Sequence, residues 1–326
     1  MRALLLDAPG SPSTLRHAEL PVPEPGPGQV RVRVEACGLN PVDYQVAGGG
    51  HPDWSWPHVL GLDVAGTVDA VGAGVTELPP GQRVAYHGDL RAPGGFAEYA
   101  LADATTLARV PDALEPVVAA ALPCAGVTAH QAVVRRLRVA AEHTVLVTGG
   151  AGGVGGYAVQ LAALAGARVI ATASAGNAEH LRKLGADEVV DYRAEDVHAR
   201  VRELTEGRGV DAIVDTVGPD SATAGLALLV HGGGVAAVAG RPDLTAVAPF
   251  GIAPSVHEIA LGAAYSHGDE RARAALSSTL TELFALVGDG RLDPMVARTL
   301  TLDEVPAGLT ELAGRHVRGK LVLSLG

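Results

Sequence analysis

Three glycines, Gly150, Gly152 and Gly155, follow the spacing G-x-G-x-x-G between a short apolar run and a helical pattern. In this spacing the first glycine allows a tight turn, the second lets a pyrophosphate approach the backbone, and the third lets a helix pack closely on a strand. The N–H groups that open the helix then face the phosphates. The motif predicts a dinucleotide-binding turn that also includes Gly153 and Val154.

The residues around this turn supply the strand and the helix that it needs. An apolar run at residues 145–147 precedes the glycines, and apolar residues at helical spacing follow over residues 154–164. A second β-rich run at residues 169–173 closes a strand–helix–strand unit. Glycine-rich turns are common, but a turn set between two such strands favours dinucleotide binding over a plain structural role.

The segment after the second strand indicates which dinucleotide binds. Sites that prefer NAD carry an Asp or Glu about 20 residues after the glycines to hold the ribose 2′-hydroxyl, whereas here no carboxylate appears before Glu179. Ser174 and Asn177 can donate hydrogen bonds to a 2′-phosphate, and Tyr192, which ends the third strand, lies within reach. We predict NADPH, with the alternative that these are ordinary loop and cap residues. The nearest basic residues are Arg182, Lys183 and Arg318.

Length and composition narrow the class of protein. A chain of 326 residues is expected to form two domains, and its 48% apolar but only 3% aromatic content predicts cores built from Ala, Val and Leu. The net charge of −11 argues against a nucleic-acid or anionic-membrane partner. The apolar run at the N-terminus is too short for a signal peptide or a membrane span, and two cysteines cannot form a disulfide framework. We therefore expect a cytoplasmic protein.

The chain divides into segments with different periodicity. Residues 1–120 contain short apolar runs separated by proline and glycine turns, which predicts a small β-barrel or sandwich. Strands and helices then alternate to about residue 240, which predicts a parallel, doubly wound α/β sheet. The strands expected in the first segment are 3–6, 30–34, 64–71, 83–85 and 97–100. Those expected in the second are 144–148, 168–173, 188–191, 210–215 and 234–239, with a sixth near 259–264.

The last segment has a mixed pattern. An amphipathic helix is expected over residues 271–287, followed by a short strand around Val296. Thr301 and Glu304 have the spacing of a capping box that opens another helix. A closing strand is expected at residues 321–325. This tail is predicted to return to the first domain.

Five segments carry a resemblance to a known family. They are residues 36–43, 61–68, 94–99, 122–129 and 318–323, in this order along the chain. The sequence resembles the medium-chain dehydrogenase/reductase superfamily, and within it the zinc-independent quinone oxidoreductase branch that includes zeta-crystallin. The resemblance implies a GroES-like β-barrel domain at 1–121, a Rossmann domain at 122–266 and a return to the first domain at 267–326. It also implies a homodimer, with residues 257–264 as the candidate edge.

The resemblance further implies roles for individual residues. Asn40 would lie beside the nicotinamide and the substrate and donate its amide N–H to a carbonyl oxygen, or else it only stabilises a turn before Pro41. Thr128 resembles the family's contact to the nicotinamide amide, with a helix N-cap as the alternative. Lys320, in the closing segment, is expected at the cofactor. By topology, Val217 and the pair Ala239–Gly240 follow strands that border the dinucleotide crevice.

The two cysteines raise the question of a metal. Zinc-dependent members of the superfamily use two Cys and a His from a Gly-His-Glu segment, and Cys37 and Cys124 look like those two cysteines. Leu62 replaces the His, and Asp63 replaces the Glu. One alternative is that both cysteines hold a metal together with Asp63 or a nearby His. We expect instead two buried thiols and no metal.

These features predict hydride transfer from NADPH to a quinone or an α,β-unsaturated carbonyl, because such acceptors are electrophilic without a Lewis acid. Tyr44 is the first candidate for the proton donor, and water is an equal contender. The other candidates are Tyr86, His87, Tyr265 and His267. Two alternatives remain open: an enoyl reductase that acts on a larger or carrier-bound intermediate, and a non-catalytic NADPH-binding protein with a structural or RNA-related role.

Overall fold

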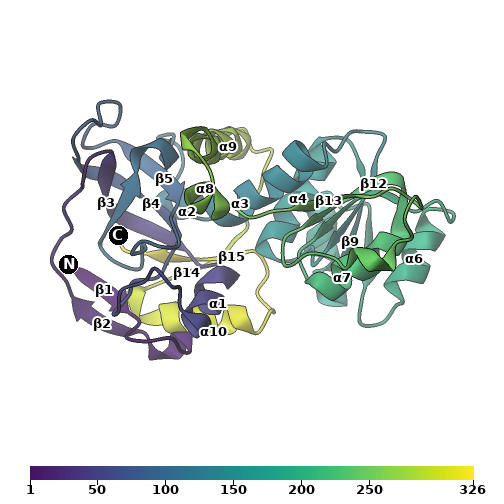
Figure 1. Ribbon diagram of the computed structural model, residues 1–326, viewed down its shortest axis with the longest axis horizontal. Helices are drawn as coiled ribbons and strands as arrows, with labels where there is room; N and C mark the ends of the chain where they lie inside the picture. The colour runs from purple at the N-terminus through teal and green to yellow at the C-terminus, as the bar shows by residue number, and fades with distance from the viewer. The chain divides into compact units, whose positions relative to one another are not determined.

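The computed structural model describes all 326 residues and contains two compact units (Figure 1). Unit 1 comprises residues 1–127, 261–290 and 294–326, and unit 2 comprises residues 128–260 and 291–293. The boundaries predicted from the sequence, 121/122 and 266/267, each differ by six residues from the boundaries 127/128 and 260/261 of these units. Residues 291–293 join unit 2 because Asp293 exchanges two hydrogen bonds with the side chain of Gln160. No helix has the length and apolar character that crossing a membrane requires.

Unit 2 is built on a six-stranded parallel sheet with strand order β10-β9-β8-β11-β12-β13. This is the doubly wound order 3-2-1-4-5-6, in which the order of strand addition reverses between β8 and β11 while all strands stay parallel. The strands are β8 (Thr144–Thr148), β9 (Arg168–Ala173), β10 (Glu188–Asp191), β11 (Val210–Asp215), β12 (Leu229–Ala237) and β13 (Ser255–Glu258). Most side chains of the central strands are buried, as expected for a parallel sheet covered on both faces.

Helices of unit 2 pack along this sheet (Figure 1). They are α4 (Gly153–Leu164), α5 (Ala178–Lys183), α6 (Val197–Leu204) and α7 (Pro219–Gly225), with a π-helical segment at Gln131–Arg136 and short 3₁₀ helices at Ala175–Asn177, Leu226–Leu228 and Leu244–Ala246. Every residue of α4 from 155 to 162 is buried. Several of them are Gly or Ala, whose small size lets the helix lie close to β8 and β9.

The prediction of a sixth strand at residues 259–264 is wrong. The sixth strand is β13, which lies just before that segment, while residues 263–266 form the short helix α8 (Ala263–Ser266) of unit 1. The apolar side chains that suggested a strand are buried, with Ile259 7% and Leu261 6% exposed. Burial does not require a strand, and an edge strand such as β13 can be polar because one of its sides has no neighbouring strand.

Unit 1 is built on a seven-stranded, mostly antiparallel sheet. Its order is β14-β15-β3-β4-β5-β7, and β6 also pairs with β3. The strands are β3 (Gln29–Gly38), β4 (Asp63–Val71), β5 (Arg83–His87), β6 (Tyr99–Asp103), β7 (Ala108–Arg109), β14 (Val296–Leu300) and β15 (Lys320–Ser324). A separate pair is formed by β1 (Arg2–Leu5) and β2 (Arg16–Glu19). The tail strand β15 pairs antiparallel with β3, so the predicted return of the tail to the first domain is correct.

The helices of unit 1 cover this sheet and its ends. They are α1 (Pro41–Gly49), α2 (Pro116–Ala120), α3 (Pro123–His130), α8, α9 (Glu270–Gly288) and α10 (Val305–Ala313), with 3₁₀ helices at Pro12–Thr14, Ala104–Thr106 and Leu302–Glu304. The last three residues of α3 belong to unit 2. The predicted capping box is present, since the Glu304 carboxylate accepts hydrogen bonds from the backbone N–H and the hydroxyl of Thr301. The predicted helix at 271–287 corresponds to α9.

Candidate functional site

The turn between β8 and α4 has the geometry that the glycine spacing requires. Gly149 adopts a φ of +68°, a conformation that other residues rarely take. A Cβ atom on Gly155 would lie 2.2 Å from the carbonyl oxygen of Gly149, so only glycine lets α4 approach the turn. A Cβ atom on Gly152 would meet nothing closer than that oxygen at 3.5 Å. The fold therefore requires glycine at 149 and 155, whereas at Gly152 it leaves room.

The open space at Gly152 lies at the N-terminus of α4. Gly152 is the N-cap of this 12-residue helix, and no side chain caps its first N–H groups. Gly150 comes close to Ala171 and Leu181, which explains its lack of a side chain. Free N–H groups at a helix start, reached through a glycine, form the kind of site that binds phosphate. The predicted residues Gly150 to Gly155 thus lie together in one turn.

The residues predicted at the 2′-phosphate gather where β9 and β10 end. The register pairs Ala173 with Asp191, so Ser174 and Tyr192 follow at equivalent positions on neighbouring parallel strands. Asn177 donates a hydrogen bond to the Ser174 hydroxyl at 3.1 Å. The sequence reasoning missed Arg193, whose guanidinium lies over the Tyr192 ring at 5.7 Å from its centroid. Its position directly after Tyr192 was the available signal.

Three basic residues were named from the sequence as nearest to these positions. The ammonium of Lys183 pairs with Glu179 at 2.8 Å. Arg182 is the residue before Lys183 on α5, and Arg318 belongs to unit 1. Arg193 is therefore the cation that unit 2 itself places beside Tyr192.

A buried carboxylate organises the loop after β11. Asp215 is fully buried and accepts hydrogen bonds at one oxygen from the hydroxyls of Thr148 and Ser221, at 2.7 and 2.5 Å. Its other oxygen accepts from the backbone N–H groups of Val217 and Gly218, at 3.1 and 3.0 Å. Asp215 was not among the predicted site residues, although an acidic residue at the end of an apolar strand was visible in the sequence.

This loop and the one after β12 follow adjacent strands. Val217 is 42% exposed, so the loop presents an apolar side chain to its surroundings. In the next loop Gly240 has a φ of +135°, and a Cβ atom there would lie 3.0 Å from the ring of Pro219. Ala239 and Gly240 lie beyond the end of β12, at the carboxyl edge of the parallel sheet, which is the edge where ligands bind in doubly wound folds.

Thr128 is not at a helix start. It is the sixth residue of α3, and it is 6% exposed. The alternative that Thr128 is an N-cap is therefore wrong, because a residue inside a helix has no unpaired N–H groups ahead of it to accept from. Its predicted contact with the nicotinamide stays a proposal.

In unit 1, Asn40 and Lys320 belong to one buried polar cluster at the end of β3. The Asn40 amide nitrogen donates to the Asp63 carboxylate at 2.9 Å and to the carbonyl of Gly38 at 3.3 Å. Its amide oxygen accepts from the Lys320 ammonium at 2.5 Å. Both amide hydrogens are used and the residue is 1% exposed. The Asn40 amide therefore has no N–H group left for the substrate carbonyl to which it was predicted to donate.

Lys320 is equally committed. Its ammonium donates to Asn40, to the carbonyl of Leu39 at 3.1 Å and to Asp63 at 3.4 Å. Its side chain is 3% exposed. The prediction that Lys320 contacts the cofactor directly therefore does not match where its charged end lies. The sheet explains the convergence, because Gly38 on β3 lies between Val322 on β15 and Asp63 on β4.

Three potential metal ligands also meet beside this cluster. A carboxylate oxygen of Asp63, a ring nitrogen of His87 and the Cys124 sulfur all lie within 4.8 Å of one another. Asp63 and His87 are paired across β4 and β5, and Asp63 accepts the Cys124 backbone N–H at 2.8 Å. Cys37 is not part of this group. It is paired with Val64 and is fully buried in the core of unit 1.

The group does not fit a divalent ion in this structure. Both oxygens of Asp63 already accept hydrogen bonds, and a positive charge, the Lys320 ammonium, stands 3.4 Å from one of them. Burial raises the pKa of the Cys124 thiol well above its ordinary range, and Asp63 raises it further, so the thiol keeps its proton. Burial lowers the pKa of His87, so its imidazole is neutral, which is the form that binds metals and does not itself oppose one. Metal-free chemistry stays a prediction, which these contacts support.

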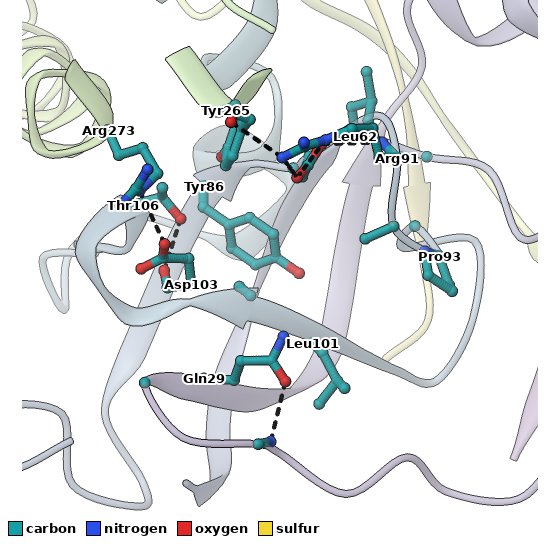
Figure 2. A pocket seen from close by; sticks show the side chains of 18 of the residues that line it. Gln29, Leu62, Tyr86, Arg91, Pro93, Leu101, Asp103, Thr106, Tyr265 and Arg273 are labelled. Atoms are coloured by element: carbon teal, nitrogen blue, oxygen red, sulfur yellow. Dashed lines mark hydrogen bonds and ion pairs between the residues drawn. The ribbon is translucent and has the colours of Figure 1, made fainter. Parts of the chain in front are cut away.

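Unit 1 also contains a cavity of about 510 Å³, which Figure 2 shows from close by. The Tyr86 ring projects into it, and its hydroxyl makes no hydrogen bond within the protein. Arg91 on its rim donates to Asp89 at 2.7 Å and to the carbonyl of Tyr265 at 3.1 Å. A second ion pair, between Arg273 and Asp103 at 3.0 Å, lies on another side. The lining is therefore polar, but its charges are paired.

The proton-donor candidates differ in their availability. Tyr265 donates its hydroxyl to the backbone carbonyl of His87. His267 shares a hydrogen bond with Ser266 and lies on the surface. Tyr44, on α1, is half-buried and has a free hydroxyl. Burial raises the pKa of Tyr86 well above its ordinary value, so Tyr86 suits hydrogen-bond donation better than proton release.

Comparisons with known proteins agree with this architecture. Residues 26–112 match the family model of the alcohol dehydrogenase GroES-like domain, and residues 184–323 match that of the zinc-binding dehydrogenase. A quinone oxidoreductase from Pseudomonas aeruginosa is 33% identical over 322 residues, 96% of this chain and 96% of that protein. The structure of the quinone oxidoreductase from Coxiella burnetii has a TM-score of 0.87 at 30% identity and covers 100% of this chain, and 99% of that chain is covered.

Other relatives show how widely the fold is used. A mycobacterial protein solved in complex with NADPH has a TM-score of 0.88 at 34% identity, covering 99% of each chain. The polyketide synthase GfsB of Streptomyces halstedii is 39% identical over 296 residues, or 90% of this chain, which spans only 5% of that protein's length. The predicted resemblance is confirmed: the chain belongs to the medium-chain dehydrogenase/reductase superfamily, in the quinone oxidoreductase branch, and is an oxidoreductase of a family that binds a nicotinamide cofactor.

Proposed function

We propose that this protein is an NADPH-dependent reductase that acts on quinones or α,β-unsaturated carbonyl compounds without zinc. The observation that carries the proposal is the uncapped N-terminus of α4, which opens onto free space at Gly152. When bound there, NADPH supplies the hydride, and the protein supplies binding and orientation. The quinone oxidoreductase of Pseudomonas aeruginosa, similar along nearly its whole length, supports the class of acceptor.

The preference for NADPH rests on the ends of β9 and β10. Ser174, Asn177 and Tyr192 offer neutral donors, and Arg193 adds a positive charge beside them. No Asp or Glu appears between the glycine turn and Glu179, where an NAD site would hold the ribose 2′-hydroxyl. The Asp191 carboxylate, just before Tyr192, accepts the backbone N–H of Arg193 at 3.0 Å. Because Arg can bind phosphate through two parallel hydrogen bonds, Arg193 is the residue we propose for the 2′-phosphate.

The proposed acceptors follow from the contacts of unit 1. Its one buried cation, the Lys320 ammonium, is bonded to three protein oxygens and is not available to polarise a substrate carbonyl. Alcohol oxidation would need a Lewis acid to lower the alcohol pKa. A quinone or an enone needs no such help, because conjugation already makes it electrophilic. We propose Tyr44 or water as the source of the proton.

The test is to incubate the protein with a panel of quinones and enones and with NADPH or NADH. Turnover is measured as the loss of absorbance of the reduced nicotinamide. We expect turnover with at least one acceptor class and a lower KM for NADPH than for NADH. Gly152→Val is the control, because it fills the space at the start of α4 while the fold tolerates a side chain there. It should abolish NADPH binding while leaving the thermal unfolding temperature unchanged. Failure with every acceptor, together with zinc-dependent oxidation of an alcohol by NADP⁺, would refute the proposal.

A second candidate is an enoyl reductase for carrier-bound chains. It is supported by the similarity to a polyketide synthase over 90% of this chain and to an erythronolide synthase over 89% of it. An enoyl thioester of pantetheine, compared with simple quinones by kcat/KM, separates the two. A higher value for the thioester favours the second candidate, while reduction of neither, despite tight NADPH binding, favours a non-catalytic role.

We further propose that the chain forms a homodimer through the edge of the unit 2 sheet. The outer strand β13 pairs only with β12, so its other side offers free backbone groups. The fully exposed Phe250 lies shortly before it in the chain. Light scattering of Val256→Pro, which removes one backbone N–H from β13, tests this. A mass equal to that of the wild-type dimer would contradict it.

A further inference from the structure

The Asp63–His87–Cys124 group offers the number and kinds of donor that a divalent ion binds. A carboxylate, an imidazole and a thiol are three protein ligands, and catalytic zinc sites commonly have three with one position open. The atoms lie within 4.8 Å of one another. The Nδ1 atom of His87 is buried, in a residue only 5% exposed, and has no hydrogen-bond partner. Geometry alone would therefore admit a metal.

We infer that the Lys320 ammonium is what keeps this group metal-free: it acts as a built-in cation for Asp63, and its removal would convert the three side chains into a divalent-metal site. The ammonium has three hydrogens and three protein acceptors, namely Asp63 and the oxygens of Leu39 and Asn40. This match of donors to acceptors is what a charged ammonium requires.

The charge balance of the cluster supports the inference. Asp63 is fully buried and Lys320 is 3% exposed, so little water screens them from each other. An ion bonded to Asp63 at the usual distance of about 2 Å would stand close to the ammonium, and the repulsion between the two cations would oppose its binding. Without the ammonium, the buried carboxylate would lack a positive partner, which favours an incoming cation.

The chain holds Lys320 in this position by its backbone. Lys320 begins β15, and its N–H donates to the carbonyl of Met295 at 2.9 Å. The preceding Gly319 has a φ of +73°, and a Cβ atom there would lie 2.3 Å from that carbonyl oxygen. A tight turn and a paired strand therefore fix the position of the Lys320 backbone, and with it the position of the ammonium. A cation held in this way does not exchange with solution, unlike a bound metal.

The experiment measures metal binding and does not depend on the acceptor or on the cofactor. Cobalt(II) is the probe, because a cobalt–thiolate bond adds a near-ultraviolet absorption band that reports Cys124 directly. The full-length chain is compared with Lys320→Met, which removes the charge but keeps an unbranched side chain, and with Lys320→Arg, which keeps the charge. A double variant, Lys320→Met with Cys124→Ser, tests the ligand. Bound zinc is counted in parallel by elemental analysis after dialysis.

We expect wild type and Lys320→Arg to show no thiolate band and no stoichiometric zinc. Lys320→Met should bind one cobalt at least about 100-fold more tightly than wild type, because one unscreened like charge has been removed. The double variant should lose the band. Stoichiometric cobalt or zinc on the Cys124 sulfur of wild type would overturn the inference, and so would Lys320→Met that binds no more tightly. If Lys320→Met does not fold, Lys320→Gln takes its place. The wild-type result still decides whether the native group is metal-free.

Discussion

Asp215 in unit 2 provides a quantitative test of how the cofactor loop is held. Its four hydrogen bonds come from two hydroxyls on one oxygen and two backbone N–H groups on the other. In Asp215→Asn one oxygen becomes an NH₂ group. The oxygen that remains must stay on the backbone of Val217 and Gly218, because an NH₂ group there would face two donors. The NH₂ group is then left facing the hydroxyls of Thr148 and Ser221.

The expected loss follows from this rearrangement. Hydrogen bonds to a charged group contribute about 1.5–3 kcal/mol each, and neutral ones about 0.5–1.5 kcal/mol. Two bonds lose their charge, and the two hydroxyls must turn from donating to accepting. We expect Asp215→Asn to lower the free energy of opening of β8 and β11 by about 2–4 kcal/mol. Asp215→Ala leaves all four donors without a partner and should cost more.

Hydrogen exchange read by mass spectrometry is the assay, because both tryptophans lie in unit 1 and their fluorescence would not report unit 2. A loss of about 2–4 kcal/mol corresponds to exchange about 30–1000-fold faster in peptides from β8 and β11. NADPH affinity should fall little in Asp215→Asn, which keeps the loop anchored, and at least about tenfold in Asp215→Ala, which loses both charge-assisted bonds to the loop.

Asp211→Asn is the matched control. It removes a carboxylate from the opposite end of the same strand, where Asp211 accepts from Thr144 N–H at 2.8 Å and pairs with Arg208. Asp211→Asn should leave the affinity for NADPH unchanged. An exchange rate in Asp215→Asn within threefold of wild type, or an equal fall in NADPH affinity for Asp211→Asn and Asp215→Ala, would show that the carboxylate does not hold the loop.

Three further predictions concern single positions. Burial raises the pKa of Asp43 to about 7, so the folded protein keeps a proton that the unfolded chain releases above its ordinary pKa of 3.8. The free energy of unfolding therefore falls as the pH rises from 4 to 7, by at most about 1.4 kcal/mol per pH unit. Urea unfolding of Asp43→Asn should lack this pH-dependent component. Equal pH dependence in both proteins would contradict it. Arg193→Ala should raise the KM for NADPH about tenfold or more and leave that for NADH unchanged, and an equal effect on both would exclude the 2′-phosphate role. Gly155→Ala should lower unit 2 stability by about 1–3 kcal/mol in thermal unfolding, whereas Gly152→Ala should not, because its Cβ would make only an ordinary contact at 3.5 Å.

The elements that are specified locally were predicted well from the sequence. The apolar runs before and after the glycine turn correspond to β8 and β9 with the predicted bounds, and the capping box at Thr301 is present. The failure at residues 259–264 has a physical reason. An edge strand needs one neighbour and little apolar character, so hydrophobicity selected the buried segment after β13 instead of β13 itself.

The partners of the polar residues were harder to predict. Lys320 and Asp63 are 257 residues apart, and Lys320 and Asn40 are 280 apart. No local pattern couples them, because their contact depends on β15 and β4 lying on either side of β3. Arg193 was missed for a different reason. Its value to the site comes from the register of β9 and β10, which places the residues after Ala173 and Asp191 side by side.

The two cysteines illustrate why residue type and family position are insufficient without register. Successive residues of a strand point to opposite faces of its sheet. On β3, Cys37 pairs with Val64 and Gly38 pairs with Asp63. Cys37 therefore shares its face with the core, while Asp63 shares the other face with His87 and approaches Cys124 on α3. A metal site that used both cysteines would require β3 to slip by one residue, which would expose its core face. The register thus rules out the pair of cysteines as joint ligands and leaves Cys124 with a different set of neighbours, among which Lys320 supplies the positive charge.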